Sequence, residues 1–102
     1  MRKKSKKVRP PIHPGEILSE DFLKPLGISA NKLARELRVP SNRIVKIVNG
    51  DRGITADTAL RLARFFNMTP DFWMNLQSHY DLEKAQDEIA EEIERDVRPR
   101  AA

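Results

Sequence analysis

The sequence contains no cysteine and no long run of apolar residues. Without cysteine the chain cannot form a disulfide framework, a thiolate zinc site or a cysteine nucleophile, which suits a protein kept in a reducing cytoplasm. No stretch approaches the roughly 20 apolar residues that a membrane-spanning helix requires. The lysine-rich N-terminus is also not followed by the apolar core of a signal peptide. We therefore expect a cytoplasmic protein with no membrane partner.

Motifs for catalysis and metal binding are missing as well. The chain has no HExxH sequence and no glycine-rich loop of the kind that binds phosphate. His13 lies alone in a proline-rich segment and His79 shows no partner ligand, so we predict no metal site. These absences argue against an enzyme and against a bound cofactor.

The charges are unevenly distributed along a chain of 102 residues with a net charge of +4. Residues 2–9 carry six Lys or Arg and no acid, whereas residues 81–96 carry eight acids against Lys84 and Arg95. The first segment is too charged to fold alone, so we expect residues 1–10 to form a disordered basic arm. Such an arm can follow phosphates, hold an acidic partner, or simply keep the chain soluble.

The acidic segment has the pattern of an amphipathic helix. Its apolar residues recur at steps of three and four, which places them in one stripe with the acids outside it. We predict a helix over residues 81–97, stopped by Pro99, and a tail over residues 98–102. The acidic side is either a solvated surface or a contact for a basic protein. The stripe consists of Leu82, Ala85, Ile89, Ile93 and Val97.

Residues 28–50 predict two short helices joined by a tight turn. Ser29 is a good N-cap, and Leu33, Ala34 and Leu37 then form a buried face. The turn falls at Arg38 and Val39, and Pro40 lies where the second helix begins, at a first-turn position that needs no amide donor. Ile44, Ile47 and Val48 face the core, and Gly50 supplies a left-handed residue after the helix.

The outer side of the second helix carries Ser41, Asn42, Val45 and Lys46. A helix laid in the major groove reaches base edges from its N-terminal end and one turn further on, which are the positions of these four residues. Arg43 and Asn49 flank them and suit phosphates. The alternative interpretation is an ordinary surface helix that carries two basic residues.

Three further helices are predicted around this pair. The first spans Gly15 to Leu26, with Ile17, Leu18, Phe22 and Leu26 at helical spacing and Gly27 after it. Another begins at Thr55 and ends at Asn67, with Ala59, Leu62, Ala63 and Phe66 facing inward. A fifth begins at Thr69-Pro70-Asp71, a cap followed by proline and an acid. The fold class is therefore all-α, with five helices in a domain over residues 11–80 and an additional acidic C-terminal helix.

Large apolar side chains are concentrated in the fifth predicted helix. Phe72, Trp73, Met74 and Leu76 give it more apolar surface than a small bundle readily covers. Core packing explains part of this surface, and a subunit interface is the other interpretation.

The chain resembles the HigA family of antidote proteins, helix-turn-helix regulators with a λ-repressor-like fold. The resemblance covers residues 11–80 and is carried by HPGEIL at 13–18, the helix pair and GITADTALRLARFFNMTPDFWMNLQ at 53–77. It implies a homodimer that binds a palindromic operator in its own promoter. It also implies that the protein neutralises a RelE-like, HigB-type mRNA-cleaving toxin by binding it directly.

The resemblance also implies roles for individual residues. Ser41, Asn42 and Lys46 would read bases, and Arg43 and Asn49 would hold phosphates. Relatives often have glutamine where this chain has Ala30 and a hydroxyl or amide where it has Pro40, so Asn31 and Lys32 are the expected substitutes for contacting the DNA backbone. Two other functions stay open: a stand-alone transcriptional regulator without a toxin, and a pure protein inhibitor that does not bind DNA.

Overall fold

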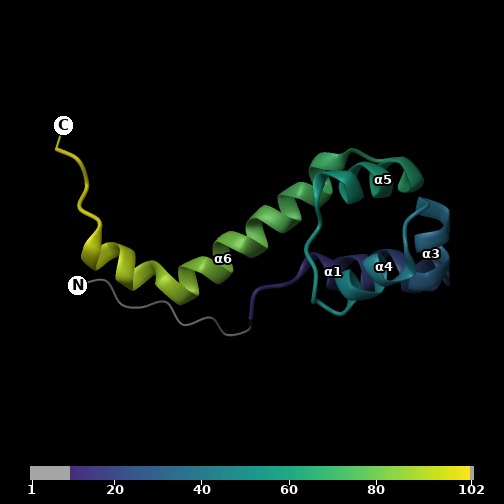
Figure 1. Cartoon of the computed structure of the whole chain (residues 1–102), viewed down its shortest axis with the longest axis horizontal. Helices are drawn as coiled ribbons and strands as arrows, with labels where there is room; N and C mark the ends of the chain where they lie inside the picture. The colour runs from purple at the N-terminus through teal and green to yellow at the C-terminus, as the bar shows by residue number, and fades with distance from the viewer. Residues whose placement is uncertain (1–9, 102) are drawn as a thin grey trace.

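The computed structural model describes residues 10–101 and shows five helices with no strand among them (Figure 1). This confirms the predicted all-α, five-helix fold. The basic arm predicted at residues 1–10 falls, except for Pro10, outside the described residues. The first helix is built of three consecutive segments, and four longer helices follow. Their bounds are α1 Pro14–Ile17, η1 Leu18–Leu23, α2 Lys24–Leu26, α3 Ala30–Leu37, α4 Ser41–Val48, α5 Ala56–Phe66 and α6 Pro70–Asp96.

The core lies where the first four helices meet the beginning of α6. Trp73 is its largest side chain and is completely buried, with the half-buried Phe22 and Phe66 packed against it at ring-centroid distances of 4.9 and 6.4 Å. The predicted inward residues of α3, α4 and α5 contribute to this cluster or pack against it, except Ala63, which is buried outside the cluster. The buried residues that form this hydrophobic cluster are Leu18, Leu23, Leu33, Ala34, Leu37, Ile44, Ile47, Ile54, Ala59, Leu62 and Trp73.

The first helix differs from the predicted pattern in its middle. Residues Leu18–Leu23 are π-helical, with the Lys24 amide donating to the Ser19 carbonyl five residues back. Leu23, at the end of this wider turn, is buried in the core with Leu18, whereas Leu26, predicted at the same helical spacing as Leu18, is 58% exposed. Pro25 lacks the amide that a regular α-helical bond to Asp21 would need.

Gly15 lies at the closest approach of the first helix to α4. A Cβ atom on this residue would stand 1.7 Å from the carbonyl oxygen of Ile47. Only glycine allows the two backbones to come this close. The HPG sequence at 13–15 therefore fixes the distance between the first helix and α4.

His13 caps the first helix and also contacts α6. Its Nδ1 accepts a hydrogen bond from the Gly15 amide at 2.8 Å, and its ring packs edge-on against Tyr80 with centroids 4.9 Å apart. Burial lowers the pKa of His13, and Asp81, a backbone hydrogen bond to Arg52, and Asp51 act in the opposite direction. The sequence predicted no metal or catalytic role for His13, and the structure gives it a structural one.

The lowered pKa of His13 predicts a loss of stability in mild acid. The folded protein takes up the proton less readily than the unfolded chain, whose histidine titrates near 6.5. Well above that pH the histidine is neutral in both states, so its titration does not change the stability. As the pH falls from 7.5 to 5.5, the free energy of unfolding should decrease. Urea denaturation of the wild type and of His13→Asn, which keeps a capping oxygen but does not titrate, measures this difference. Parallel pH profiles would contradict the prediction.

The acidic segment is helical as predicted, and it continues the fifth helix without a break. α6 runs through Pro70–Asp96 because no glycine or proline interrupts residues 71–96. The boundary that we placed between residues 80 and 81 thus lies inside a helix. The second half of α6 projects away from the other helices, and it exposes Leu82, Ile89 and Ile93 (Figure 1). Within residues 10–101 no helix is long and apolar enough to cross a membrane.

Candidate nucleic-acid interface

The turn between α3 and α4 is made by local hydrogen bonds. Ser29 caps α3 as predicted, and its Oγ accepts from the Lys32 amide at 3.0 Å. Arg38 takes a left-handed conformation with φ of 63°, and the Val39 amide donates to the Ala34 carbonyl at 3.0 Å. These bonds terminate α3 and redirect the chain within two residues. Pro40 is the residue that precedes α4 and lies one position before the predicted first turn.

α4 has one buried and one exposed side. Ile44 and Ile47 are completely buried, and Val48 packs against the same core. Ser41, Asn42, Lys46 and Asn49 are exposed, and Val45 is half-buried at the edge of this surface. Gly50, with φ of 83°, follows the helix as predicted. The structure therefore gathers the predicted base-reading residues on one accessible side of a firmly packed helix.

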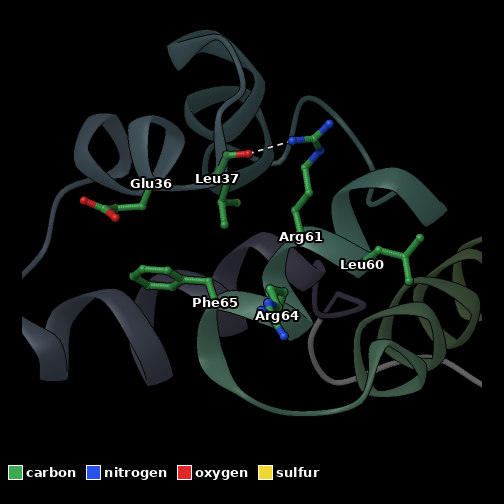
Figure 2. A pocket seen from close by; sticks show the side chains of 6 residues that line it. All are labelled: Glu36, Leu37, Leu60, Arg61, Arg64 and Phe65. Carbon is green, nitrogen blue, oxygen red and sulfur yellow. Dashed lines mark hydrogen bonds between the residues drawn. The ribbon is translucent and has the colours of Figure 1, made fainter.

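Arg43 lies in an ion-pair cluster rather than in the exposed row. Its side chain is 24% exposed, and its Nη1 donates to Asp57 Oδ1 at 2.8 Å. Arg61 Nε donates to the same oxygen at 2.8 Å. Arg61 Nη1 donates to the Leu37 carbonyl at 2.8 Å, the bond drawn in Figure 2. This cluster, which we call the Asp57 cluster, joins α5 to the beginning of α4 and the end of α3. Hydrogen bonding to Arg61 is the main reason that the pKa of Asp57 is lowered, and Arg43 adds to it.

Asn31 and Lys32 lie exposed in the first turn of α3. Lys32 Nζ is 3.8 Å from Glu36 Oε2, one helical turn along. This exposed pair is weak, so the ammonium group can exchange it for a phosphate. The structure thus leaves both proposed backbone contacts accessible.

The predicted interface residues of the fifth helix do not share one environment. Trp73 is completely buried within the chain, so its assignment to an interface is wrong: the core encloses it. Leu76 is half-buried against that core. Phe72 and Met74 are each 36% exposed, and they remain as predicted contacts with another subunit.

A shallow open groove lies between the end of α3 and α5. Its volume is about 330 Å³, and Glu36, Leu37, Leu60, Arg61, Arg64 and Phe65 line it (Figure 2). Within residues 10–101 no group of three potential metal ligands comes together.

Several functional details of the framework were missed in the sequence, and some of them depend on distant residues. Arg61 lies one turn after Asp57, a spacing that signals an ion pair, but nothing local indicates that Arg43 joins it. Gln77 Oε1 accepts from the Ile54 amide at 2.6 Å and holds the loop after α4 against α6. The cap by His13 could have been found from the histidine that directly precedes proline at a helix start.

Helices α3 and α4, with their tight turn, buried inner sides and polar outer row, define a helix-turn-helix protein. The helix-turn-helix family model matches residues 20–73. A HigA-family addiction module antidote protein from Coxiella burnetii is 52% identical, with 90% of this chain and 100% of that chain covered and a TM-score of 0.85. The structure of Pseudomonas aeruginosa antitoxin HigA with the higBA promoter has 46% identity, 89% and 99% coverage and a TM-score of 0.87.

A curated relative gives a similar result. Virulence-associated protein I from Dichelobacter nodosus is 56% identical over 77 residues, which span 76% of this chain and 71% of that protein. The chain belongs to the HigA family of helix-turn-helix antitoxins.

Proposed function

We propose that this protein is an antitoxin that binds a palindromic operator of its own operon through α4 and neutralises a RelE-like toxin by direct contact. The observation that carries the DNA-binding part is the accessible row Ser41, Asn42 and Lys46 on a helix whose other side is buried. A relative with 46% identity has been solved with its promoter, which supports this role. Relatives that are named as antitoxins and transcriptional regulators also support a binding protein rather than an enzyme.

Individual residues have distinct roles in this proposal. Ser41, Asn42 and Lys46, with Val45 at their edge, contact base edges in the major groove. Asn49, Asn31 and Lys32 contact phosphates. Arg43 acts by holding the beginning of α4 on Asp57, and it reaches a phosphate only if that ion pair opens. Residues 11–80 form the DNA-binding unit, and residues 81–97 offer a surface for a protein partner.

The protein is expected to bind a palindromic site upstream of its own gene with two chains per site. Phosphate contacts dominate such affinity, so the logarithm of the binding constant should fall linearly with the logarithm of salt concentration. Titration of a labelled promoter fragment at several salt concentrations, with the mass of the complex determined by light scattering, measures both quantities. Equal affinity for a scrambled fragment would contradict specific recognition of an operator, and no binding to either fragment would favour the pure inhibitor.

A palindrome is matched by a two-fold symmetric dimer. Phe72 and Met74 supply exposed apolar surface at the beginning of α6 for such a contact. The neighbouring Trp73 gives this stretch a fixed backbone, because its side chain is enclosed in the core. We therefore place the subunit interface at Phe72 and Met74.

The toxin-binding surface is proposed on the second half of α6. An RNA-cleaving toxin carries a basic surface, and this half of α6 carries eight acids beside an exposed apolar stripe. Electrostatic complementarity speeds the encounter and sets orientation, whereas apolar contacts supply much of the affinity. Because this half projects from the body, it can be occupied while α4 lies on DNA (Figure 1).

Deletion of residues 81–102 is expected to remove most of the toxin affinity while operator binding persists. Calorimetry with the toxin encoded beside the gene measures the loss, and circular dichroism shows that the shortened chain stays folded. As a matched test, Glu16→Gln with Glu20→Gln on the first helix should leave toxin affinity unchanged. Full affinity in the shortened chain would move the toxin contact to that first helix. Absence of any adjacent toxin gene would favour a stand-alone regulator.

A further inference from the structure

One side of α6 beyond Tyr80 is lined by carboxylates. From Tyr80, steps of three and four residues lead to Glu83, Asp87, Glu91 and Glu94, which therefore follow one another along the same side of the helix. We call these four residues the acidic row. Glu83 Oε1 lies 3.8 Å from His79 Nε2. Within residues 10–101, Asp87 and Glu91 have no ion-pair partner.

The acidic row and the apolar stripe occupy opposite sides of α6. At about 100° of rotation per residue, Leu82 and Ile89 lie about 160–180° around the helix from Tyr80. Both are exposed, as is Ile93. A ligand for the acidic row can therefore be bound without covering the stripe, and the row calls for a cationic ligand with little apolar surface.

The chain leaves the folded body beside the beginning of the acidic row. The ring of His13 packs on Tyr80, the residue from which the row starts, and Pro10 is the first described residue. Residues 2–9, which lie just before it, carry six positive charges and no acid. Because His13 contacts Tyr80, the basic arm is joined to the folded body close to the residue at which the acidic row begins.

The length of the arm matches the length of the row. Eight extended residues span at most about 26–29 Å, because each adds up to about 3.3–3.6 Å. The helix rises about 21 Å between Tyr80 and Glu94, at about 1.5 Å per residue. The arm can therefore reach every carboxylate of the row.

No comparable acidic path exists on the described surface of the helix-turn-helix. Asp57 is engaged by Arg43 and Arg61, and Glu36 lies near Lys32. The exposed row of α4 carries Lys46 and no acid. A basic arm is repelled by that surface and attracted by α6.

We propose that residues 2–9 dock along the acidic row of the same chain. Each exposed ion pair contributes little, about 0.2–1 kcal/mol, so the docking depends on several pairs at once and is sensitive to salt. A polyanion such as the phosphate backbone competes with the row for the same charges. The arm thus neutralises part of α6 in the free protein and leaves the apolar stripe open to a protein partner. This inference does not rest on the proposed function.

A spin label on the arm tests the docking directly. Because the chain has no cysteine, Ser5→Cys provides a unique attachment site. In a 15N-labelled full-length protein at low salt, we expect a selective loss of amide signal over residues 83–94. The signals should return in 1 M salt, where the screening length falls to about 3 Å. They should also return after Asp87→Asn with Glu91→Gln.

A matched control removes two carboxylates elsewhere. Asp71→Asn with Glu36→Gln should leave the signal loss over residues 83–94 in place. Broadening that is absent, or that is spread evenly over α3, α4 and α6, would overturn the proposal. So would broadening that appears only when spin-labelled chains without 15N are mixed with 15N-labelled chains, because the arm would then lie on a second copy. None of these outcomes depends on operator or toxin binding.

Discussion

Replacing Gly15 with alanine is expected to destabilise the protein by more than about 3 kcal/mol, beyond the usual range for overpacking. The added Cβ would stand 1.7 Å from the carbonyl oxygen of Ile47. This neighbour belongs to the backbone, which cannot move aside as a flexible side chain could. The first helix must move off α4 or the domain must unfold. For a domain of this size the melting temperature should fall by roughly 12–24 °C, which differential scanning calorimetry measures.

Gly27→Ala is the matched control for Gly15→Ala. Gly27 has φ of 67°, but a Cβ there would meet no atom within 4 Å. Its replacement carries only the left-handed backbone penalty of roughly 1–2 kcal/mol. A Gly15→Ala variant that melts like the wild type would show that α1 and α4 do not approach closely in solution.

Asn42→Ala and Lys46→Ala are each expected to weaken operator binding by about 1–3 kcal/mol, or roughly 5-fold to 150-fold. Both side chains project from the exposed row of α4, so their removal should leave the melting temperature unchanged. Discrimination between the operator and a scrambled site should decrease in each variant. The double variant will not be strictly additive, because the two residues are one helical turn apart.

Controls separate base contacts from general electrostatics. Lys32→Ala removes a proposed phosphate contact and should weaken binding to all sequences alike. The slope of the logarithm of the binding constant against the logarithm of salt concentration should decrease in magnitude by about one. Lys84→Ala, on the projecting half of α6, should have no effect on operator affinity. If Asn42→Ala reduces binding to operator and scrambled DNA equally, Asn42 does not read bases.

Several helix boundaries were predictable because the signals that set them are local. Ser29 and Thr55 cap the helices that follow them. Their hydroxyl oxygens accept hydrogen bonds from the backbone amides of Lys32 and Thr58, at 3.0 and 3.4 Å. Gly27 and Asn67 take left-handed conformations at the helix ends where they were expected. Each feature involves residues within one turn of each other, so their spacing in the sequence carries the information.

The features that the sequence did not indicate come from packing between distant segments. The π-helical turn that buries Leu23 depends on the shape of the core, and periodicity alone placed Leu26 there instead. The enclosure of Trp73 needs the first helix and α5 on either side of it. The ion pair between Arg43 and Asp57 spans 14 residues, so phosphate binding was the natural prediction for an arginine beside a base-reading row.

The continuity of α6 changes the thermodynamics of any partner that binds its far half. Starting a helix is costly because several residues are fixed for one hydrogen bond, whereas extending an existing helix is nearly free. The turns around Trp73 are already fixed by the core, so they act as the nucleus from which residues 81–96 propagate. A partner of this half therefore meets a helix that is already formed and need not supply the free energy for ordering it.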